Sequence, residues 1–356
     1  MTVLIALLGL IFLIVVHELG HMLTAKALGV RVTEFGVGFG PALFKKRFGK
    51  TVYSFRVILL GGFAKMAGME DIGSVAQERG ELGPDTYPAK KPWRRALIIF
   101  AGPFANLLAA VLILAVVYMF SGAPTGKVTT EVSAVTSDSL AAEVGIKAGD
   151  ELVAIDGTAI GNWSGFTEAV EKREPGDEVT VAVERNGAKK TFSGELGADP
   201  NDKERALVGV SPVQEMKRYG PIAAIGLASQ QIVEITGMLI QFIGLLITGQ
   251  QDFYDNVTGP VGIATVGSAS IAGGYFLPLL AFISLNLAIM NLLPILPLDG
   301  GHLLLIAVEK IIGRPVSAQT MGKIAFLGLA LILTLFLFAT YADVSKLIQG
   351  QPFIPE

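Results

Sequence analysis

TVLIALLGLIFLIVVHELGHMLTAKAL, at residues 2–28, is an apolar run that carries two histidines and a glutamate in its second half. The run exceeds the roughly 18 apolar residues that suffice for a membrane-spanning helix. A secretory signal peptide carries positive charge ahead of its apolar stretch, whereas the first lysine here is Lys26. We therefore expect residues 2–28 to be a retained transmembrane helix with ionisable side chains inside it.

Three further apolar runs, at 96–120, 276–296 and 323–341, are also long enough to cross a bilayer. The 356-residue chain is 51% hydrophobic and 17% charged, against roughly 25% charged in ordinary soluble domains. Its net charge of −3 gives no reason to expect nucleic acid as a partner. The absence of cysteine excludes disulfides and thiolate metal ligands. The sequence thus predicts a multi-span α-helical membrane protein with four transmembrane helices.

The orientation of these helices follows from the distribution of basic residues, because cytoplasmic loops are enriched in lysine and arginine. Residues 26–95 and 297–323 contain such residues, whereas 249–275 contains Asp252 and Asp255 but no lysine or arginine. We expect the first two segments to be cytoplasmic and the third to be external. Both chain termini are then external.

Residues 122–211 differ in composition, being polar, charged and rich in β-branched residues. Within them, VTVAVE at 179–184 alternates in the manner of a half-buried strand, and Asn186-Gly187 is typical of a two-residue hairpin turn. This part of the chain is predicted to be a soluble β-rich domain on the external side.

Residues 221–248 are apolar but contain one serine, three glutamines and a glutamate. A helix at the membrane surface, or packed on the spans, fits this mixture better than a lone span does. The predicted domains are an N-terminal membrane part at 1–121, the β-rich domain at 122–211, an amphipathic interfacial segment at 212–258 and a C-terminal membrane part at 259–356.

HELGH at 17–21 matches the pattern H-E-x-x-H. On a helix, His17 and His21 share one face and can bind one Zn²⁺, while Glu18 can take a proton from a metal-bound water. A chance match is the alternative, but the chain has only three histidines and two of them are here. Ionisable residues at membrane depth are costly and are functional by default. Since Thr2 to His17 spans about 22 Å of helix, the site is expected toward the cytoplasmic face.

A catalytic zinc needs a third protein ligand, and Asp299 in NLLPILPLDGG at 291–301 is the candidate. Pro294 and Pro297 break a helix at a depth where irregular backbone survives only inside protein or beside a wet cavity. An ordinary Asp-Gly turn is the alternative. For Asp299 to meet His21, residues 221–248 must not cross the membrane. His302 is expected to support the site rather than to bind the metal.

Together these two motifs resemble those that define the site-2 protease family of intramembrane zinc metalloproteases, in particular its bacterial regulator-of-sigma-E protease group. KPWRRA at 91–96 with AGPFAN at 101–106 resembles the start of the family's second span, and GPVGI at 259–263 resembles the segment that leads into its third.

The resemblance implies roles for individual residues. His17, His21 and Asp299 would bind Zn²⁺, and Glu18 would be the general base. Asn291 and Asn106 would help to hold the substrate backbone or the oxyanion near the metal. For Asn106, a packing role between helices is the alternative.

Residues 122–211 resemble a PDZ domain through LAAEVGIKAGD at 140–150 and IDG at 155–157. In the family this domain is thought to restrict access by bulky substrates, and PDZ domains take an extended peptide along a sheet edge. Some family members carry two PDZ domains, whereas this chain has room for one.

Residues 51–67 show a strand-like alternation from Tyr53 to Leu59, followed by Gly61-Gly62, where a tight reversal is expected. In the family this region is a membrane-associated β-hairpin, and its free edge could pair with an unwound substrate. A peripheral cytoplasmic hairpin is the alternative.

The resemblance implies a protease of the bacterial inner membrane, with its PDZ domain extracytoplasmic and its active site toward the cytoplasm. Its substrates would be single-span membrane proteins in the lipid bilayer, such as an anti-sigma factor already cut by a site-1 protease, or a remnant signal peptide. Two other classes remain open. A transporter would typically show inverted repeats, which we do not find, and an inactive PDZ scaffold would not require Glu18.

Overall fold

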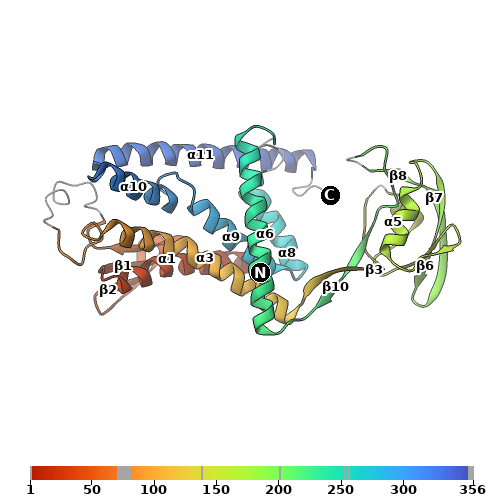
Figure 1. Cartoon of the computed structure of the whole chain (residues 1–356), viewed down its shortest axis with the longest axis horizontal. Helices are drawn as coiled ribbons and strands as arrows, with labels where there is room; N and C mark the ends of the chain where they lie inside the picture. Colours follow the sequence, from red (N-terminus) through yellow and green to blue (C-terminus); the bar gives the residue numbers. More distant parts are fainter. Residues whose placement is uncertain are drawn as a thin grey trace. The chain divides into compact units, whose positions relative to one another are not determined.

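The computed structural model describes residues 2–69, 82–137, 139–199, 202–251, 254 and 257–351. The chain forms two compact units (Figure 1): Tyr118–Tyr219 is one, and the chain on either side of it makes the other. Asp252 and Asp255, which contributed to the predicted orientation, lie outside the described residues.

The larger unit consists mainly of apolar helices. They are α1 (Thr2–Ala27), α3 (Pro92–Phe120), α6 (Pro221–Ile247), α8 (Pro260–Ala272), α9 (Phe276–Asn291), α10 (Asp299–Ile312) and α11 (Ala318–Gln349). Within the described residues, four helical segments are long and apolar enough to cross a membrane: Leu4–Ala27, Pro92–Phe120, Pro221–Leu246 and Ala318–Gln349. The number agrees with the prediction, and three of the four are the predicted ones.

The fourth candidate differs from the predicted third span. The run 276–296 is helical only to Asn291, because the prolines that follow cannot continue a helix. At 16 residues, α9 is about 24 Å long, which is shorter than the roughly 30 Å of hydrocarbon. By contrast, α6 has 27 residues and is long enough to span, although it was predicted to be interfacial. In Figure 1, however, α6 runs across the direction of α3 and α11 rather than along it.

A β-hairpin lies between the first two long helices in sequence. It is built from β1 (Val32–Phe48) and β2 (Thr51–Met66), which pair antiparallel. Residues 34–37 are paired with 52–55 and also with 62–65, so the chain changes direction again between residues 55 and 62. The predicted strand at 51–67 is therefore confirmed. The turn that joins the two strands lies at residues 49–50. It is separate from the second change of direction, between residues 55 and 62, near which a reversal was expected at Gly61-Gly62.

The segment GPVGI at 259–263 is held by the last helix. Asp343 of α11 is fully buried, and its carboxylate accepts hydrogen bonds from the backbone N–H groups of Gly259, at 2.9 Å, and Gly262, at 2.7 Å. These donors belong to the start of α8, where N–H groups lack partners within the helix. The carboxylate therefore caps α8 and fixes it against α11.

The smaller unit is β-rich, as predicted. Its strands are β3 (Ala123–Val135), β4 (Glu151–Ile155), β5 (Thr158–Ala159), β6 (Glu178–Arg185), β7 (Ala188–Glu195), β8 (Gly197–Ala198), β9 (Ala206–Leu207) and β10 (Val210–Lys217), and its helices are α4 (Leu140–Val144) and α5 (Trp163–Glu171). The main sheet has the order β10-β3-β4-β6-β7, with β5 paired to β4.

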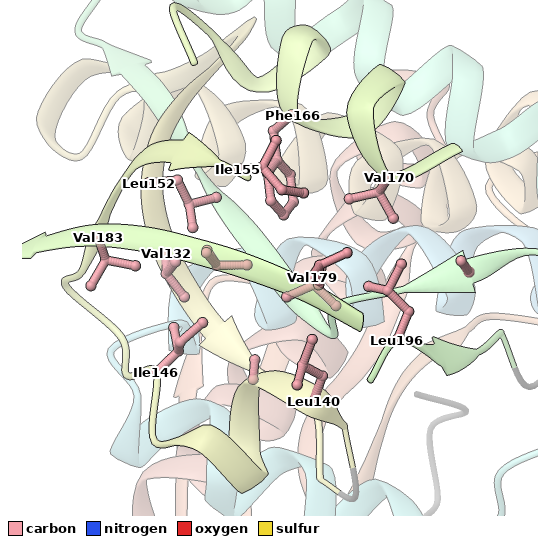
Figure 2. Close-up of a cluster of buried hydrophobic side chains, with 14 residues drawn as sticks. Val132, Leu140, Ile146, Leu152, Ile155, Phe166, Val170, Val179, Val183 and Leu196 are labelled. Atoms are coloured by element: carbon pink, nitrogen blue, oxygen red, sulfur yellow. The ribbon is translucent and has the colours of Figure 1, made fainter. Parts of the chain in front are cut away.

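The core of this unit is formed by side chains from the sheet, α4 and α5 (Figure 2). Val179, Val181 and Val183 alternate inward from β6 and are at most 1% exposed, and Phe166 of α5 packs into the same cluster. The predicted Asn186-Gly187 turn is confirmed, since it joins β6 to β7 with positive φ at both residues, 55° and 76°. Such values match the twist of the flanking strands.

A second core lies in the larger unit, beneath the hairpin. It contains Met22 of α1, Phe35 of β1, Ile98 of α3 and Ile306 of α10, all buried. The neighbouring elements α1 and β1 are thereby packed together with α3 and α10, which lie much further along the chain. This packing positions the side chains described next.

Candidate metal centre

The two histidines of the first motif lie one turn apart on α1, as their spacing predicted. Their rings meet edge to face with centroids 4.8 Å apart, and their Nε2 atoms are 3.2 Å apart. Both Nε2 lone pairs are thus directed to one point beside the helix.

The structure brings Asp299 to that point from the other end of the chain. Its Oδ2 atom lies 3.1 Å from His17 Nε2 and 3.4 Å from His21 Nε2. Asp299 is the first residue of α10, where the helix dipole favours a negative charge. A Cβ atom on the next residue, Gly300, would lie 2.2 Å from the carbonyl oxygen of Leu292. Only glycine therefore allows α10 to start so close to the preceding loop.

These distances fit a tetrahedral zinc ion. With metal–ligand bonds of about 2.0–2.1 Å, two ligands of a tetrahedral site are about 3.3 Å apart, and the three observed separations are 3.1, 3.2 and 3.4 Å. Asp299 Oδ2 is buried and has no hydrogen-bond donor among the described residues. Two neutral imidazoles, one carboxylate and one open position are the ligand set of many catalytic zinc sites. The residues present therefore fit the ion.

The helix α3 packs against the two imidazoles. His21 Nδ1 donates a buried hydrogen bond of 2.8 Å to the carbonyl oxygen of Ile98. A Cβ atom on Gly102 would lie 2.3 Å from His21 Nε2 and 2.9 Å from His17 Cε1, so only glycine fits there. Pro103 follows within the helix, and it has no N–H to donate to the carbonyl oxygen of residue 99, which is adjacent to Ile98.

Glu18 is half-buried and faces the hairpin. A Cβ atom on Gly62 of β2 would lie 3.1 Å from Glu18 Cγ, and the backbone of Ala64 hydrogen bonds to the Glu18 carboxylate. The last part of β2 thus passes beside the carboxylate that follows His17 in the motif.

The other predicted site residues are placed differently. Asn106 is 1% exposed, and its Nδ2 atom lies 3.4 Å from His17 Nδ1. Asn291 is the last residue of α9, and its Nδ2 donates to the carbonyl oxygen of Leu287 in the same helix at 2.9 Å. Among the described residues, the metal-ligand cluster contains His17, His21 and Asp299 but not His302.

Sequence reasoning missed a buried ion pair that supports the site. Arg95, near the start of α3, donates to Glu309 Oε2 of α10 at 2.6 Å, and both side chains are 7% exposed. Glu309 Oε1 also accepts from the backbone N–H of Val316. The available signal was Glu309 in the stretch LLLIAVEKII at 303–312, in which every other residue except Lys310 is apolar. Because α10 begins with Asp299, this pair anchors the carboxylate-bearing helix to α3.

Comparison with known proteins gives consistent matches over most of the chain. The model of Peptidase family M50 matches residues 5–335. A putative zinc metalloprotease of Agrobacterium fabrum is 34% identical over 363 residues, which cover 96% of this chain and 95% of that protein. The zinc metalloprotease RasP of Geobacillus kaustophilus is 30% identical, covering 94% of this chain and 95% of its own.

Two further similarities concern a named regulator and a small domain. The regulator of sigma-W protease RasP of Bacillus subtilis is 28% identical, and the match covers 94% of this chain and 96% of that protein. Among solved structures, the PDZ domain of an SdrC-like protein from Listeria monocytogenes matches 26% of this chain and 94% of its own, with 24% identity and a TM-score of 0.22. From the match across residues 5–335 and the extent of these relatives, the chain belongs to Peptidase family M50 and is a zinc metalloprotease of the site-2 type.

Proposed function

We propose that this metalloprotease hydrolyses peptide bonds within or near the transmembrane segment of single-span membrane proteins. One observation carries the proposal. The Nε2 atoms of His17 and His21 and the Oδ2 atom of Asp299 meet within 3.4 Å of one another, and the helix that supplies both imidazoles is apolar enough to span a bilayer.

The chain's own residues suggest how hydrolysis proceeds. His17, His21 and Asp299 would hold Zn²⁺, and the ion, when bound, would polarise a carbonyl and lower the pKa of a bound water toward about 7. Glu18 accepts a proton from the attacking water and returns it to the leaving amine. The burial of the ligands limits access by bulk water.

The position of the site along α1 supports an active centre toward the cytoplasmic side. From His21 to the end of the helix at Ala27 is about 9 Å. For Asp299 to reach the same end of the bundle as His21, an even number of crossings must lie between the end of α1 and Asp299. When α6 stays in the interface, α3 and α9 are those two crossings. The course of α6 across α3 and α11 supports that assignment (Figure 1). The protein is then a multi-pass inner-membrane protease with its β-rich domain extracytoplasmic.

The substrate must present an unwound backbone, because a helix hides its peptide bonds in its own hydrogen bonds. The stretch of β2 beside Glu18 offers strand edges to which such a segment can pair. The β-rich domain at 118–219 would act as a PDZ domain that limits access by bulky substrates. One relative is named a regulator of a sigma factor, which supports an anti-sigma factor or remnant signal peptide as substrate, trimmed first by another protease.

A reconstituted cleavage assay tests this proposal. The purified full-length protein in liposomes is given two single-span substrates that differ only in whether the segment contains a helix-breaking Gly-Pro pair or leucines at that place. We expect cleavage inside the segment of the first substrate, inhibition by a zinc chelator and recovery on adding zinc. Glu18→Gln should retain zinc and lose about 10²–10⁴-fold in rate.

The controls separate the parts of the proposal. Cleavage confined to residues outside the membrane would refute the intramembrane assignment, and cleavage that persists in chelator would refute the metal. Full activity of the Glu18→Gln variant would remove Glu18 from the general-base role.

A further inference from the structure

The second ring nitrogen of His17 has an unusual neighbour. A neutral imidazole that binds a metal through Nε2 carries its proton on Nδ1, and that N–H needs an acceptor to fix the ring. The side-chain amide of Asn106 lies beside it, with its Nδ2 atom 3.4 Å away. The amide oxygen, Oδ1, is buried and has no hydrogen-bond partner among the described residues.

Turning this amide by 180° exchanges its oxygen and nitrogen without moving the rest of the side chain. Oδ1 then accepts the proton of His17 Nδ1, and Nδ2 moves to where Oδ1 lay. The exchange satisfies Oδ1 and the Nδ1 proton and removes the donor–donor contact that Nδ2 would make with a protonated Nδ1. An unsatisfied buried acceptor costs about 1–3 kcal/mol, and this favours the turned arrangement once His17 Nε2 is engaged by a metal.

We propose that Asn106 is a positioning residue that fixes the tautomer and the ring orientation of His17, so that Nε2 stays free for zinc. The inference rests on the proposed zinc site. It gives His17 the same support that His21 receives from the carbonyl oxygen of Ile98 at 2.8 Å. Both supports come from α3, which itself contributes no metal ligand.

The surroundings of Asn106 agree with this role better than with substrate contact. The side chain is 1% exposed, and it meets His17 at Nδ1, whereas the metal side of the ring is Nε2. Ser284 of α9, which is fully buried, donates to the backbone carbonyl oxygen of Asn106 at 2.8 Å. The same helix leads into the loop that ends at Asp299. Helix α9 is therefore bonded to the backbone of Asn106 and also helps to position the Asp299 carboxylate.

The test compares two replacements in the full-length protein that keep the branching and the number of side-chain heavy atoms of asparagine. Asn106→Asp keeps an acceptor for the Nδ1 proton, whereas Asn106→Leu removes it. Asn286→Leu is the matched control, because within the described part of the chain the Asn286 amide bonds only to a carbonyl of its own helix, that of Phe282. Zinc affinity is measured by competition with a chromophoric chelator, and the visible spectrum of the Co²⁺-substituted protein reports the ligand geometry.

We expect Asn106→Leu to weaken zinc binding by about 10–100-fold, as for other groups that hold a metal ligand in place, and to alter the Co²⁺ spectrum. Asn106→Asp should stay near the wild type, as should Asn286→Leu. If Asn106→Leu does not fold, Asn106→Ala replaces it in the same comparison with Asn106→Asp.

Three results would overturn the inference. Zinc affinity and a Co²⁺ spectrum unchanged in Asn106→Leu would show that no acceptor is needed. An equal loss in Asn106→Asp would assign the effect to packing. A raised KM with unchanged zinc affinity would assign Asn106 to substrate binding. In all three cases the wild type still binds zinc, whereas a wild type that binds no zinc would refute the proposed function and this inference together.

Discussion

Replacing Gly102 with alanine should disrupt the metal centre directly, because the added methyl group would meet both imidazoles. The added Cβ would lie 2.3 Å from His21 Nε2, 2.5 Å from its Cε1 and 2.9 Å from His17 Cε1. Ordinary van der Waals contact begins at 3.4 Å, so the ring or the α3 backbone must yield by about 1.1 Å. His21 cannot simply rotate away, because its Nδ1 is bound to the carbonyl oxygen of Ile98.

The consequence for zinc can be estimated from this displacement. Bond lengths at a metal site hold to within about 0.2 Å, which is several-fold less than the required movement. Removing a hydrogen bond that merely supports a ligand costs about 10–100-fold in metal affinity. Because Gly102→Ala displaces the ligand itself, we expect a loss of about 100-fold or more.

The assay is chelator competition in detergent, with helical content and thermal unfolding measured in parallel. Gly322→Ala is the control, because that glycine also lies in a helix, α11, and a Cβ there meets nothing within 4 Å. Wild-type zinc affinity in a folded Gly102→Ala variant would refute the claim that α3 sets the positions of the two imidazoles.

Other substitutions test the remaining supports of the structure. Asp299→Ala should lower bound zinc by elemental analysis, and an unchanged zinc content would remove that residue from the ligand set. Glu309→Leu leaves Arg95 buried without its partner, which typically costs about 3–5 kcal/mol; the double replacement with Arg95→Leu should recover part of the lost thermal stability, and no recovery would contradict a pairwise interaction. In the β-rich domain, the Arg185 guanidinium holds the pKa of the Asp150 carboxyl below its usual value. A depressed folded pKa adds stability above the unfolded value of about 3.9, and this stability is lost as the pH falls through the folded pKa. Arg185→Met should therefore raise the pH at which hydrogen exchange at 150–185 loses protection, and an identical acid profile would count against the pair.

The metal cluster could be predicted from the sequence because local geometry determines most of it. A spacing of four residues places His17 and His21 on one helical face whatever the tertiary structure. The chemistry of zinc then requires a third ligand, and Asp299 stands out in the sequence because two prolines precede it in an apolar segment. Topology supplied the remaining restriction, since both stretches must reach the same side of the membrane.

The hairpin was only partly predictable, because its pairing is long-range. The alternation from Tyr53 to Leu59 identified β2. Its partner β1 contains GVGFGP at 36–41, in which glycine and proline obscure any period. The double pairing of residues 34–37 depends on a change of direction in β2 that alternation does not encode. Similarly, composition identified α6 and α9 as apolar but did not decide which of them is long enough to span a membrane. That depends on where each helix ends.

The sequence indicated α3 through Asn106 and the motifs at 91–96 and 101–106, but it did not indicate that this helix supports both imidazoles and the helix of Asp299, since none of its residues is a metal ligand. In the structure it contacts every element that supplies one. Its Ile98 carbonyl and Asn106 amide lie at the Nδ1 atoms of the two α1 histidines, and its Arg95 is paired with α10, which begins at Asp299. The α1 and α3 contacts run in opposite order, so the two helices are antiparallel, as consecutive membrane crossings must be. Any movement that admits substrate while zinc stays bound must therefore keep α1, α3 and the start of α10 together, and with them α9, whose Ser284 is bonded to the Asn106 carbonyl.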